Sequence, residues 1–211
     1  MTNFDALFHT LKRPSFLIGM FVLLIYLFCY IDIPIAESCH FLRDTWLHPL
    51  CSIFTVLGFG AFYLVLLPAL ALCTRYLGSS RLWARRFLFL WGGLVCTSLF
   101  CMLCKVLLGR ARPDLWFSHH WFGFFGFKWD NLFWSFPSGH TATGMGLAYL
   151  ATCLHPKYWY AYWGLGTIIA ISRVLMDYHY VSDVLATAYV VLFIIAGYKK
   201  LVQHWFVEVL P

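Results

Sequence analysis

Charged residues are scarce in this chain. Only 11% of its 211 residues are Asp, Glu, Lys or Arg, whereas 62% are hydrophobic and 20% are aromatic. Soluble globular domains usually carry about 25% charged residues. The deficit excludes an ordinary soluble domain and indicates that lipid is the solvent around most of the surface.

Acidic residues are rarer than basic ones. Nine Asp and Glu stand against fifteen Lys and Arg, which gives a formal net charge of +6. A positive excess can serve nucleic-acid binding, but the chain offers no polar face that would display a basic patch. We therefore expect no nucleic-acid partner, and we relate the positive charge to membrane topology and to anionic ligands.

The chain also lacks internal repeats, low-complexity tracts and linker-like stretches. Any of these would point to a repeat array or to several folding units. Their absence, together with the chain length, favours a single membrane-embedded domain over residues 1–211.

The eight cysteines lie mostly inside apolar runs, where a thiol behaves as a small hydrophobic side chain. Cys101 and Cys104 form a C-x-x-C pattern, but no second pair accompanies it, so we expect no metal site there. Cys39 and Cys51 flank one loop. Whether they form a disulfide depends on the compartment that this loop faces, and the sequence leaves the question open.

Six apolar segments are each close to the roughly 20 residues that a helix needs to cross the hydrocarbon core of a bilayer. They predict an all-α fold, a polytopic membrane protein built as a six-transmembrane-helix bundle. The first follows Lys12 and Arg13 and exceeds the 7–15 apolar residues of a cleavable signal, so we interpret it as an uncleaved helix. The fourth is short, and its Gly-rich start is expected inside the bundle. The segments are 15–31, 50–76, 87–108, 140–154, 158–176 and 181–201.

The distribution of Lys and Arg among the loops predicts the orientation of the bundle. With the N-terminus inside, nine of these residues fall on the cytoplasmic side and six on the opposite side. Both termini are then cytoplasmic, and the long segment 109–137 lies outside. That segment is rich in aromatic residues, which predicts an interfacial belt that is compatible with a lipid-entry lip over a site. They are Trp116, Phe117, Trp121, Phe122, Phe124, Phe125, Phe127, Trp129, Phe133 and Trp134.

Three polar motifs interrupt the apolar pattern at the predicted outer ends of the helices. They are "KVLLGRARPD" from Lys105, "PSGH" from Pro137 and "SRVLMDYHYVSD" from Ser172. Taken singly, each has a structural explanation: a lysine that reaches the interface, a helix N-cap, and a buried His–Asp pair. Ionisable residues at membrane depth are expensive and usually functional, so three motifs on one side of a small bundle indicate a site.

The residue types in these motifs suit phosphate chemistry. Lys105, Arg112 and Arg173 supply three cations, which match a phosphate dianion. Backbone N–H groups at Ser138–His140, at a helix start, add an anion cradle. A histidine oriented by a carboxylate can act as a nucleophile, and a second histidine can protonate a leaving oxygen. No carboxylate cluster suited to magnesium is present, so the arginines would neutralise charge in place of a metal.

The three motifs together resemble those of the type 2 phosphatidic acid phosphatase family, whose site is similar to that of vanadium haloperoxidases. The family patterns are K-x6-R-P, P-S-G-H and S-R-x5-H-x3-D. The chain matches all three spacings in order, within residues 105–183. The resemblance implies a metal-independent enzyme without a cofactor and, for membrane members, six helices.

The resemblance also implies a role for each matching residue. His179 would attack phosphorus and form a phosphohistidine, and Asp183 would hold its ring. His140 would protonate the departing oxygen and then activate water. The non-bridging oxygens would be held by Lys105, Arg112, Arg173, Ser138 and the Gly139 backbone.

These observations favour a lipid phosphatase on the outer side of a membrane, in the manner of a bacterial inner-membrane protein. Its substrate would be phosphatidic acid, phosphatidylglycerol phosphate, undecaprenyl pyrophosphate or lipid A. A lipid-to-lipid phosphotransferase that uses the same phosphohistidine is the alternative, and a non-catalytic binder of anionic lipid is a third hypothesis. The sequence names neither the lipid nor the oligomeric state.

Three ionisable residues fall outside the family positions. We expect Arg110 and Asp114 to tune contact with the lipid headgroup. We expect Asp177 to pair with a nearby cation, and the adjacent His119 and His120 to be interfacial.

Overall fold

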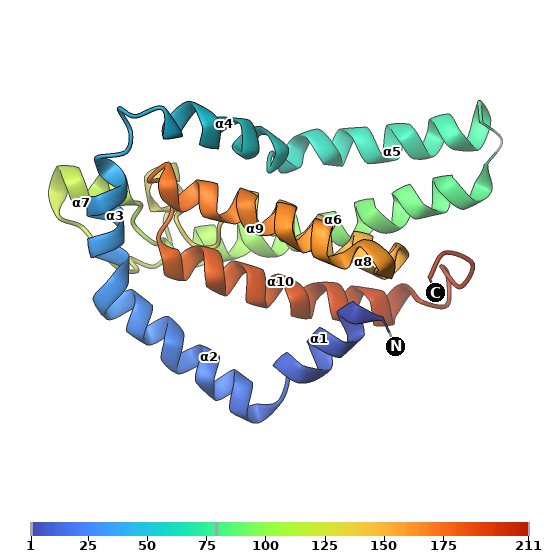
Figure 1. Cartoon of the computed structure of the whole chain (residues 1–211), viewed down its shortest axis with the longest axis horizontal. Coiled ribbons are helices and arrows are strands. Elements are labelled where there is room, and N and C mark those ends of the chain that lie inside the picture. Colours follow the sequence, from blue (N-terminus) through green and yellow to red (C-terminus); the bar gives the residue numbers. More distant parts are fainter. Residues whose placement is uncertain (1, 79, 211) are drawn as a thin grey trace.

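The computed structural model describes residues 2–78 and 80–210, and these residues form helices and loops without a β-strand. Figure 1 shows long helices side by side, with α7 and the loops around it at one end of the molecule. Both chain termini lie at the other end. The prediction of an all-α fold is confirmed.

All six predicted apolar segments are helical, with three departures from the expected boundaries. The first segment continues to His40, the second is broken between α4 and α5, and the third begins at Arg81 instead of residue 87. Short helical turns join several of the helices. In chain order the elements are α1 (Asn3–Leu11), α2 (Pro14–Tyr26), η1 (Leu27–Ile31, a π-helical turn), α3 (Asp32–His40), α4 (Leu47–Leu57), α5 (Gly60–Tyr76), α6 (Arg81–Leu108), α7 (Pro113–His119), η2 (Asn131–Phe133), α8 (Gly139–Leu154), η3 (Pro156–Tyr158), α9 (Trp159–Leu175) and α10 (Val181–Val202).

In the part of the chain that the structure describes, four helical rods are long and apolar enough to cross a membrane, so the chain is a multi-pass membrane protein. They are Pro14–His40, Leu47–Tyr76, α6 and α10. The predicted count of six spans is not confirmed, because α8 and α9, with 16 and 17 residues, are shorter than these four. Twelve of the 16 residues of α8 are buried, so protein rather than lipid surrounds this helix.

Small side chains let the neighbouring helices approach α8 closely, as is common in membrane bundles. A Cβ atom added to Gly144 would lie 3.1 Å from the side chain of Ile169 on α9, and one added to Gly146 would meet Leu94 of α6 and Val191 of α10. The core around α8, whose start carries the second motif, therefore fixes the relative positions of α6, α9 and α10, the helices whose ends carry the first and third motifs.

The first rod is held to this bundle mainly at its two ends. α2 has no buried residue and stands apart from the other helices in Figure 1. On one side of α2, the short helix α1 buries Phe4 against Tyr149, and its Asp5 accepts a hydrogen bond from Lys199 at 2.6 Å. On the other side, Asp32 at the start of α3 is fully buried.

Gly109 ends α6 and turns the chain toward the site with a left-handed backbone at φ +51°. A Cβ atom at this position would overlap the carbonyl oxygen of Gly126. Two backbone hydrogen bonds hold these segments together: the Phe125 N–H donates to Gly109 O at 3.0 Å, and the Gly126 N–H donates to Leu108 O at 3.1 Å.

We predict that Gly109→Ala destabilises the protein more than Gly126→Ala does. Gly126 also has a left-handed backbone, at φ +75°, but a Cβ atom there would meet nothing within 4 Å. The control variant Gly126→Ala should therefore lower the free energy of unfolding by about 1–2 kcal/mol, from backbone strain alone. Gly109→Ala should lower the free energy of unfolding by about 2 kcal/mol more, because it also disrupts the two hydrogen bonds. Thermal unfolding in detergent measures the difference, and equal unfolding temperatures would contradict the prediction.

Candidate active site

The three motifs meet at the end of the bundle opposite the chain termini. Lys105 lies in the last turn of α6, and Arg173 lies in the last turn of α9. Arg112 precedes α7, Ser138 precedes α8, and His179 lies in the turn between α9 and α10. Helix ends therefore bring together residues that are up to 74 positions apart, from Lys105 to His179.

Lys105, Arg112 and Arg173 form a cluster of positive charge. His140 lies within electrostatic range of all three cations and of His179. The Lys105 ammonium would be 3.5 Å from a Cβ atom placed on Gly139, so the first motif touches the second. Within residues 2–78 and 80–210, none of the three cations forms an ion pair with a carboxylate. Their charge is therefore available to an anionic ligand.

Arg173 is held in place by neutral groups. Its Nη1 donates to the hydroxyl of Thr55 at 2.9 Å, and its guanidinium carbon lies 4.3 Å from the ring centroid of Tyr178. The side chain is only 4% exposed. Neutral supports orient the guanidinium without cancelling its charge, which is what an anion site requires.

Ser138 acts as the N-cap of α8. Its hydroxyl oxygen accepts from the Thr141 hydroxyl at 3.0 Å and from the Thr141 N–H at 3.4 Å. Its own N–H donates to the hydroxyl of Thr187 at 2.9 Å. The amide of Ser138 is thus occupied, whereas the amides of Gly139 and His140 are the first two of a helix and have no partner within it. The role of the Ser138 side chain in holding phosphate stays a prediction.

The imidazole of His179 is buried and held in one orientation. Its Nδ1 lies 2.6 Å from the carbonyl oxygen of Ser135 and 3.9 Å from Oδ2 of Asp183. A carbonyl only accepts hydrogen bonds, so Nδ1 carries the hydrogen and Nε2 keeps a free lone pair.

The same surroundings keep His179 neutral. Burial is the main cause that lowers the pKa of His179 to about 4, Arg112 and Arg173 lower it further, and Asp183 opposes the shift. The ring is therefore uncharged at pH 7, which is the state that a nitrogen nucleophile needs.

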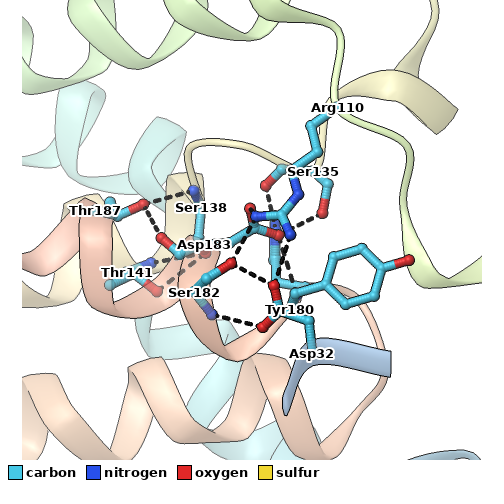
Figure 2. Close-up of polar contacts among 10 residues, drawn as sticks. Asp32, Arg110, Ser135, Ser138, Thr141, Tyr180, Ser182, Asp183 and Thr187 are labelled. Atoms are coloured by element: carbon cyan, nitrogen blue, oxygen red, sulfur yellow. Dashed lines mark hydrogen bonds and ion pairs between the residues drawn. The ribbon is translucent and has the colours of Figure 1, made fainter. Parts of the chain in front are cut away.

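Asp183 supports His179 through Ser135 rather than by a direct hydrogen bond. Its carboxylate accepts from the Ser135 hydroxyl at 2.6 Å and from the Tyr180 N–H at 3.0 Å, as part of the network drawn in Figure 2. The Ser135 carbonyl is the nearer partner of Nδ1, and Asp183 lies behind it at 3.9 Å. That Asp183 orients the ring stays a prediction.

Arg110 does not face a lipid headgroup, so that prediction is wrong. Its side chain is fully buried, and its guanidinium donates to Asp183 at 2.5 Å, to Ser182 at 2.8 Å and to Asp32 at 2.7 Å. Asp32, which belongs to α3, was not among the predicted site residues. A carboxylate directly after an apolar segment was the available signal, because such residues are costly in a membrane.

The remaining ionisable residues form a separate group beside the site. Asp177 pairs with Arg43 at 3.2 Å, which confirms that it has a cationic partner. Asp114 also pairs with Arg43, at 2.8 Å. Its predicted contact with a lipid headgroup stays a prediction. His119 and His120 are exposed, as expected of interfacial residues.

Two further features concern possible metal ligands and the pair Cys39 and Cys51. In the described parts of the chain, no three His, Cys, Asp or Glu side chains come together in a way that could hold a metal ion. Cys39 and Cys51 are both buried, and they are not bonded to each other.

A cavity of about 510 Å³ adjoins the cation cluster. It lies between α5, α6 and α8, with Lys105, Gly139 and His140 in its lining. The break between α4 and α5, at Gly58 and Phe59, forms another part of the wall. Most of the lining is apolar, so the cavity can take an alkyl chain whose polar end meets the cations.

We predict that Gly58→Ala lowers activity by displacing His140. A Cβ atom on Gly58 would lie 2.8 Å from the side chain of Ile169 and 3.0 Å from Cβ of His140, so one of them must move. A displacement of this kind should reduce kcat by about tenfold or more. Gly164→Ala is the matched control, because a Cβ atom there would meet nothing within 4 Å. Steady-state phosphate release measures both variants, and equal kcat values would refute the prediction.

A known protein family matches the region that carries the three motifs. The profile of the PAP2 superfamily matches residues 86–206. The chain belongs to the PAP2 superfamily. The matched region contains every residue of the three motifs, and it leaves out Asp32 and the first two helical rods.

Two curated relatives share part of this PAP2 chain. A lipid A 1-phosphatase from Rhizobium johnstonii is 35% identical over 104 residues, which cover 49% of this chain and 42% of the relative. A lipid A 1-phosphatase from Rhizobium etli is 35% identical over 98 residues, 46% of this chain and 42% of the relative. The alignments thus span less than half the length of these relatives.

A solved structure extends the likeness to nearly the whole PAP2 chain. The crystal structure of a transmembrane PAP2-type phosphatidylglycerolphosphate phosphatase from Bacillus subtilis superposes with a TM-score of 0.56 at 20% identity. The match covers 89% of this chain and 96% of that one. At 20% identity this structural similarity shows a shared fold. Because it covers 89% of the chain, the shared fold extends beyond residues 86–206.

Proposed function

We propose that this PAP2 protein is a membrane lipid phosphatase that hydrolyses a phosphate monoester or pyrophosphate through a phosphohistidine, without a metal. The observation that carries the proposal is the set of three cations without carboxylate partners beside a buried, neutral His179. Such a set can bind a phosphate dianion and stabilise the charge of its transition state. Membership of the PAP2 superfamily and the phosphatase relatives support a phosphoric ester hydrolase.

In the proposed first step, Nε2 of His179 attacks phosphorus and the bond from phosphorus to the leaving oxygen breaks. His140 gives a proton to that oxygen, which departs as an alcohol or a phosphate. The bound dianion is the counter-charge that lets His140 carry this proton among so many cations. Lys105, Arg112 and Arg173 hold the non-bridging oxygens throughout.

In the second step, His140 takes a proton from water, and the resulting nucleophile attacks the phosphohistidine. The bond from phosphorus to Nε2 breaks, inorganic phosphate leaves, and His179 returns to its neutral state. The Nδ1–H of His179 keeps its hydrogen bond to the Ser135 carbonyl, so the ring presents the same nitrogen in both steps.

Two features support an amphiphilic substrate that enters from the bilayer. The mostly apolar cavity beside the cations suits an acyl or prenyl chain. In addition, several aromatic side chains of the loop 109–137 are exposed, among them Trp121, Phe125 and Trp129, as expected of residues that meet lipid. The names of the relatives make lipid A and phosphatidylglycerol phosphate the first candidates, and phosphatidic acid and undecaprenyl pyrophosphate follow.

The site end and the termini end of the bundle lie opposite each other (Figure 1). With the positive residues of the termini end in the cytoplasm, the chemistry takes place on the outer face. A bacterial inner membrane is the proposed location, and the bacterial origin of the phosphatase relatives supports it.

Phosphate release in detergent micelles with excess chelator tests the proposal. Wild-type protein is assayed on the four lipids, and we expect at least one to release phosphate at a rate that the chelator does not change. Loss of release with chelator, restored by a divalent metal, would sink the metal-independent mechanism. Folded protein that releases no phosphate from any of the lipids would contradict the proposed function.

A lipid-to-lipid phosphotransferase is the second candidate, since a second lipid could reach the phosphohistidine through the same apolar cavity. Adding acceptor lipids to the assay separates the two reactions. A hydrolase yields inorganic phosphate whichever acceptor is present, whereas a transferase yields a phosphorylated acceptor at the expense of free phosphate.

A further inference from the structure

A buried ionic network ties the first helical rod to the site. Asp32 is fully buried, and its Oδ2 accepts from Nη2 of Arg110 at 2.7 Å. Its Oδ1 accepts from the N–H of Ser182 at 2.9 Å, in the first turn of α10. α2, which precedes Asp32, has no buried residue. Asp32 therefore attaches the rod at the site end, together with the buried Ala36 and Cys39 of α3 and the His40–Asp177 pair.

Arg110 lies between two carboxylates in a dry environment. It reaches Asp32 with one arm of the guanidinium and Asp183 with the other, as Figure 2 shows. A planar guanidinium held at both arms has a single orientation, and a buried charge cannot move away from its partners without a large cost. Aromatic rings surround it within 4.8–5.6 Å: Phe28, Phe122, Phe124 and Tyr180.

The network continues from Arg110 to the candidate nucleophile. Nη1 of Arg110 donates to Oδ1 of Asp183, and the hydroxyl of Ser135 donates to Oδ2 of the same carboxylate at 2.6 Å. The carbonyl of Ser135 in turn accepts from Nδ1 of His179 at 2.6 Å. In the described parts of the chain, Asp32 and Arg110 form no hydrogen bond or ion pair with the cations that would hold phosphate.

We propose that Asp32 and Arg110 are positioning residues for the nucleophile. Asp32 fixes the guanidinium of Arg110, which keeps Asp183 against Ser135. Ser135 then holds the ring of His179 so that Nε2 points at phosphorus. The inference rests on the proposed role of His179, and it gives the first helical rod a part in the chemistry besides crossing the membrane.

We expect Asp32→Asn to lower kcat by about 10–100-fold, because a displacement of about 1 Å at the reacting group can cost about 100-fold. KM should stay within about threefold of the wild type, because the cations that bind phosphate keep their positions. Arg110→Gln should lower kcat at least as much, and Arg110→Lys should retain more activity than Arg110→Gln, since it keeps the charge. Asp5→Asn, which removes a carboxylate from the ion pair with Lys199 at the opposite end, is the matched control and should leave kcat unchanged.

The double variant Asp32→Asn/Arg110→Gln tests whether Asp32 acts through Arg110. If it does, the double variant should have the kcat of Arg110→Gln within about twofold, because residues in one network are not additive. Losses that multiply would show two independent effects and would overturn the proposed chain of contacts. All rates are expressed per folded molecule, determined by thermal unfolding, so a purely structural role would lower the yield and leave kcat intact.

The outcomes also separate this inference from the proposed function. An active wild type together with a folded Asp32→Asn protein of full kcat would overturn the positioning role alone. A folded wild type that releases phosphate from no substrate would contradict the nucleophilic role of His179, and the positioning role would fall with it.

Discussion

The His179→Ala variant is expected to release phosphate at least about 10⁴ times more slowly than the wild type, the scale on which removal of a nucleophile acts. Alanine leaves no atom that can bond to phosphorus, while the three cations still bind the substrate. KM or the substrate affinity should therefore change little. Release of inorganic phosphate from the best lipid of the panel is the measurement.

His119→Ala is the matched control for this prediction. His119 is exposed in the aromatic loop and bonds only to its neighbour Ser118 in the described structure. It should keep the wild-type rate. A His179→Ala protein that retains more than about one hundredth of that rate would rule out His179 as the nucleophile, whatever the cations do.

Trapping the intermediate tests the same role without a steady-state rate. His140→Ala, given a radiolabelled phosphate ester with a good leaving group, should accumulate labelled protein, because the first step then needs no acid while the second still needs a base. The label should be lost in acid and kept in base, as for a phosphohistidine. Label that remains when His179 is also replaced would contradict the assignment.

The second large effect is expected from Arg173→Ala, which should lower kcat by about 10²–10³-fold, as the loss of one charge-stabilising donor does in other enzymes. Arg173 is oriented by Thr55 and Tyr178 and has no carboxylate partner in the described structure, so its whole charge acts on the ligand. Arg173→Lys should recover part of the loss, because it keeps the charge but not the planar fork.

Arg43→Ala separates this effect from a general loss of positive charge. Arg43 lies near the same end of the bundle, but Asp114 and Asp177 neutralise it. We expect its kcat to stay within about threefold of the wild type. Equal losses in the two variants would point to long-range electrostatics instead of a specific phosphate contact.

Much of the fold followed from the hydrophobic pattern, and the exceptions have physical causes. The predicted helix 181–201 is observed as Val181–Val202, and the predicted helix 140–154 as Gly139–Leu154. The pattern could not tell whether an apolar helix of this length faces lipid or protein. α8 is apolar because the bundle surrounds it, and the same composition would have suited a membrane span.

The structure brings the predicted site residues together, but the sequence did not predict their contacts. Arg110 and Arg112 are two positions apart, yet one pairs with buried carboxylates and the other has no carboxylate partner in the described structure. Spacing along the chain cannot separate them, because the turn after Gly109 decides which way each side chain points. The Ser135 carbonyl was equally hidden, since a backbone group leaves no signature in the sequence.

The positions of the two chain ends have a practical consequence for anything fused to this protein. Both lie at the end of the bundle away from the candidate site (Figure 1). The rods α6 and α10, which carry site residues at one end, are each long enough to cross a bilayer. If the bundle has the proposed orientation, an affinity tag, a fluorescent reporter or a further domain joined to either end would emerge on the opposite side of the membrane from the candidate site and leave the lipid's approach unobstructed.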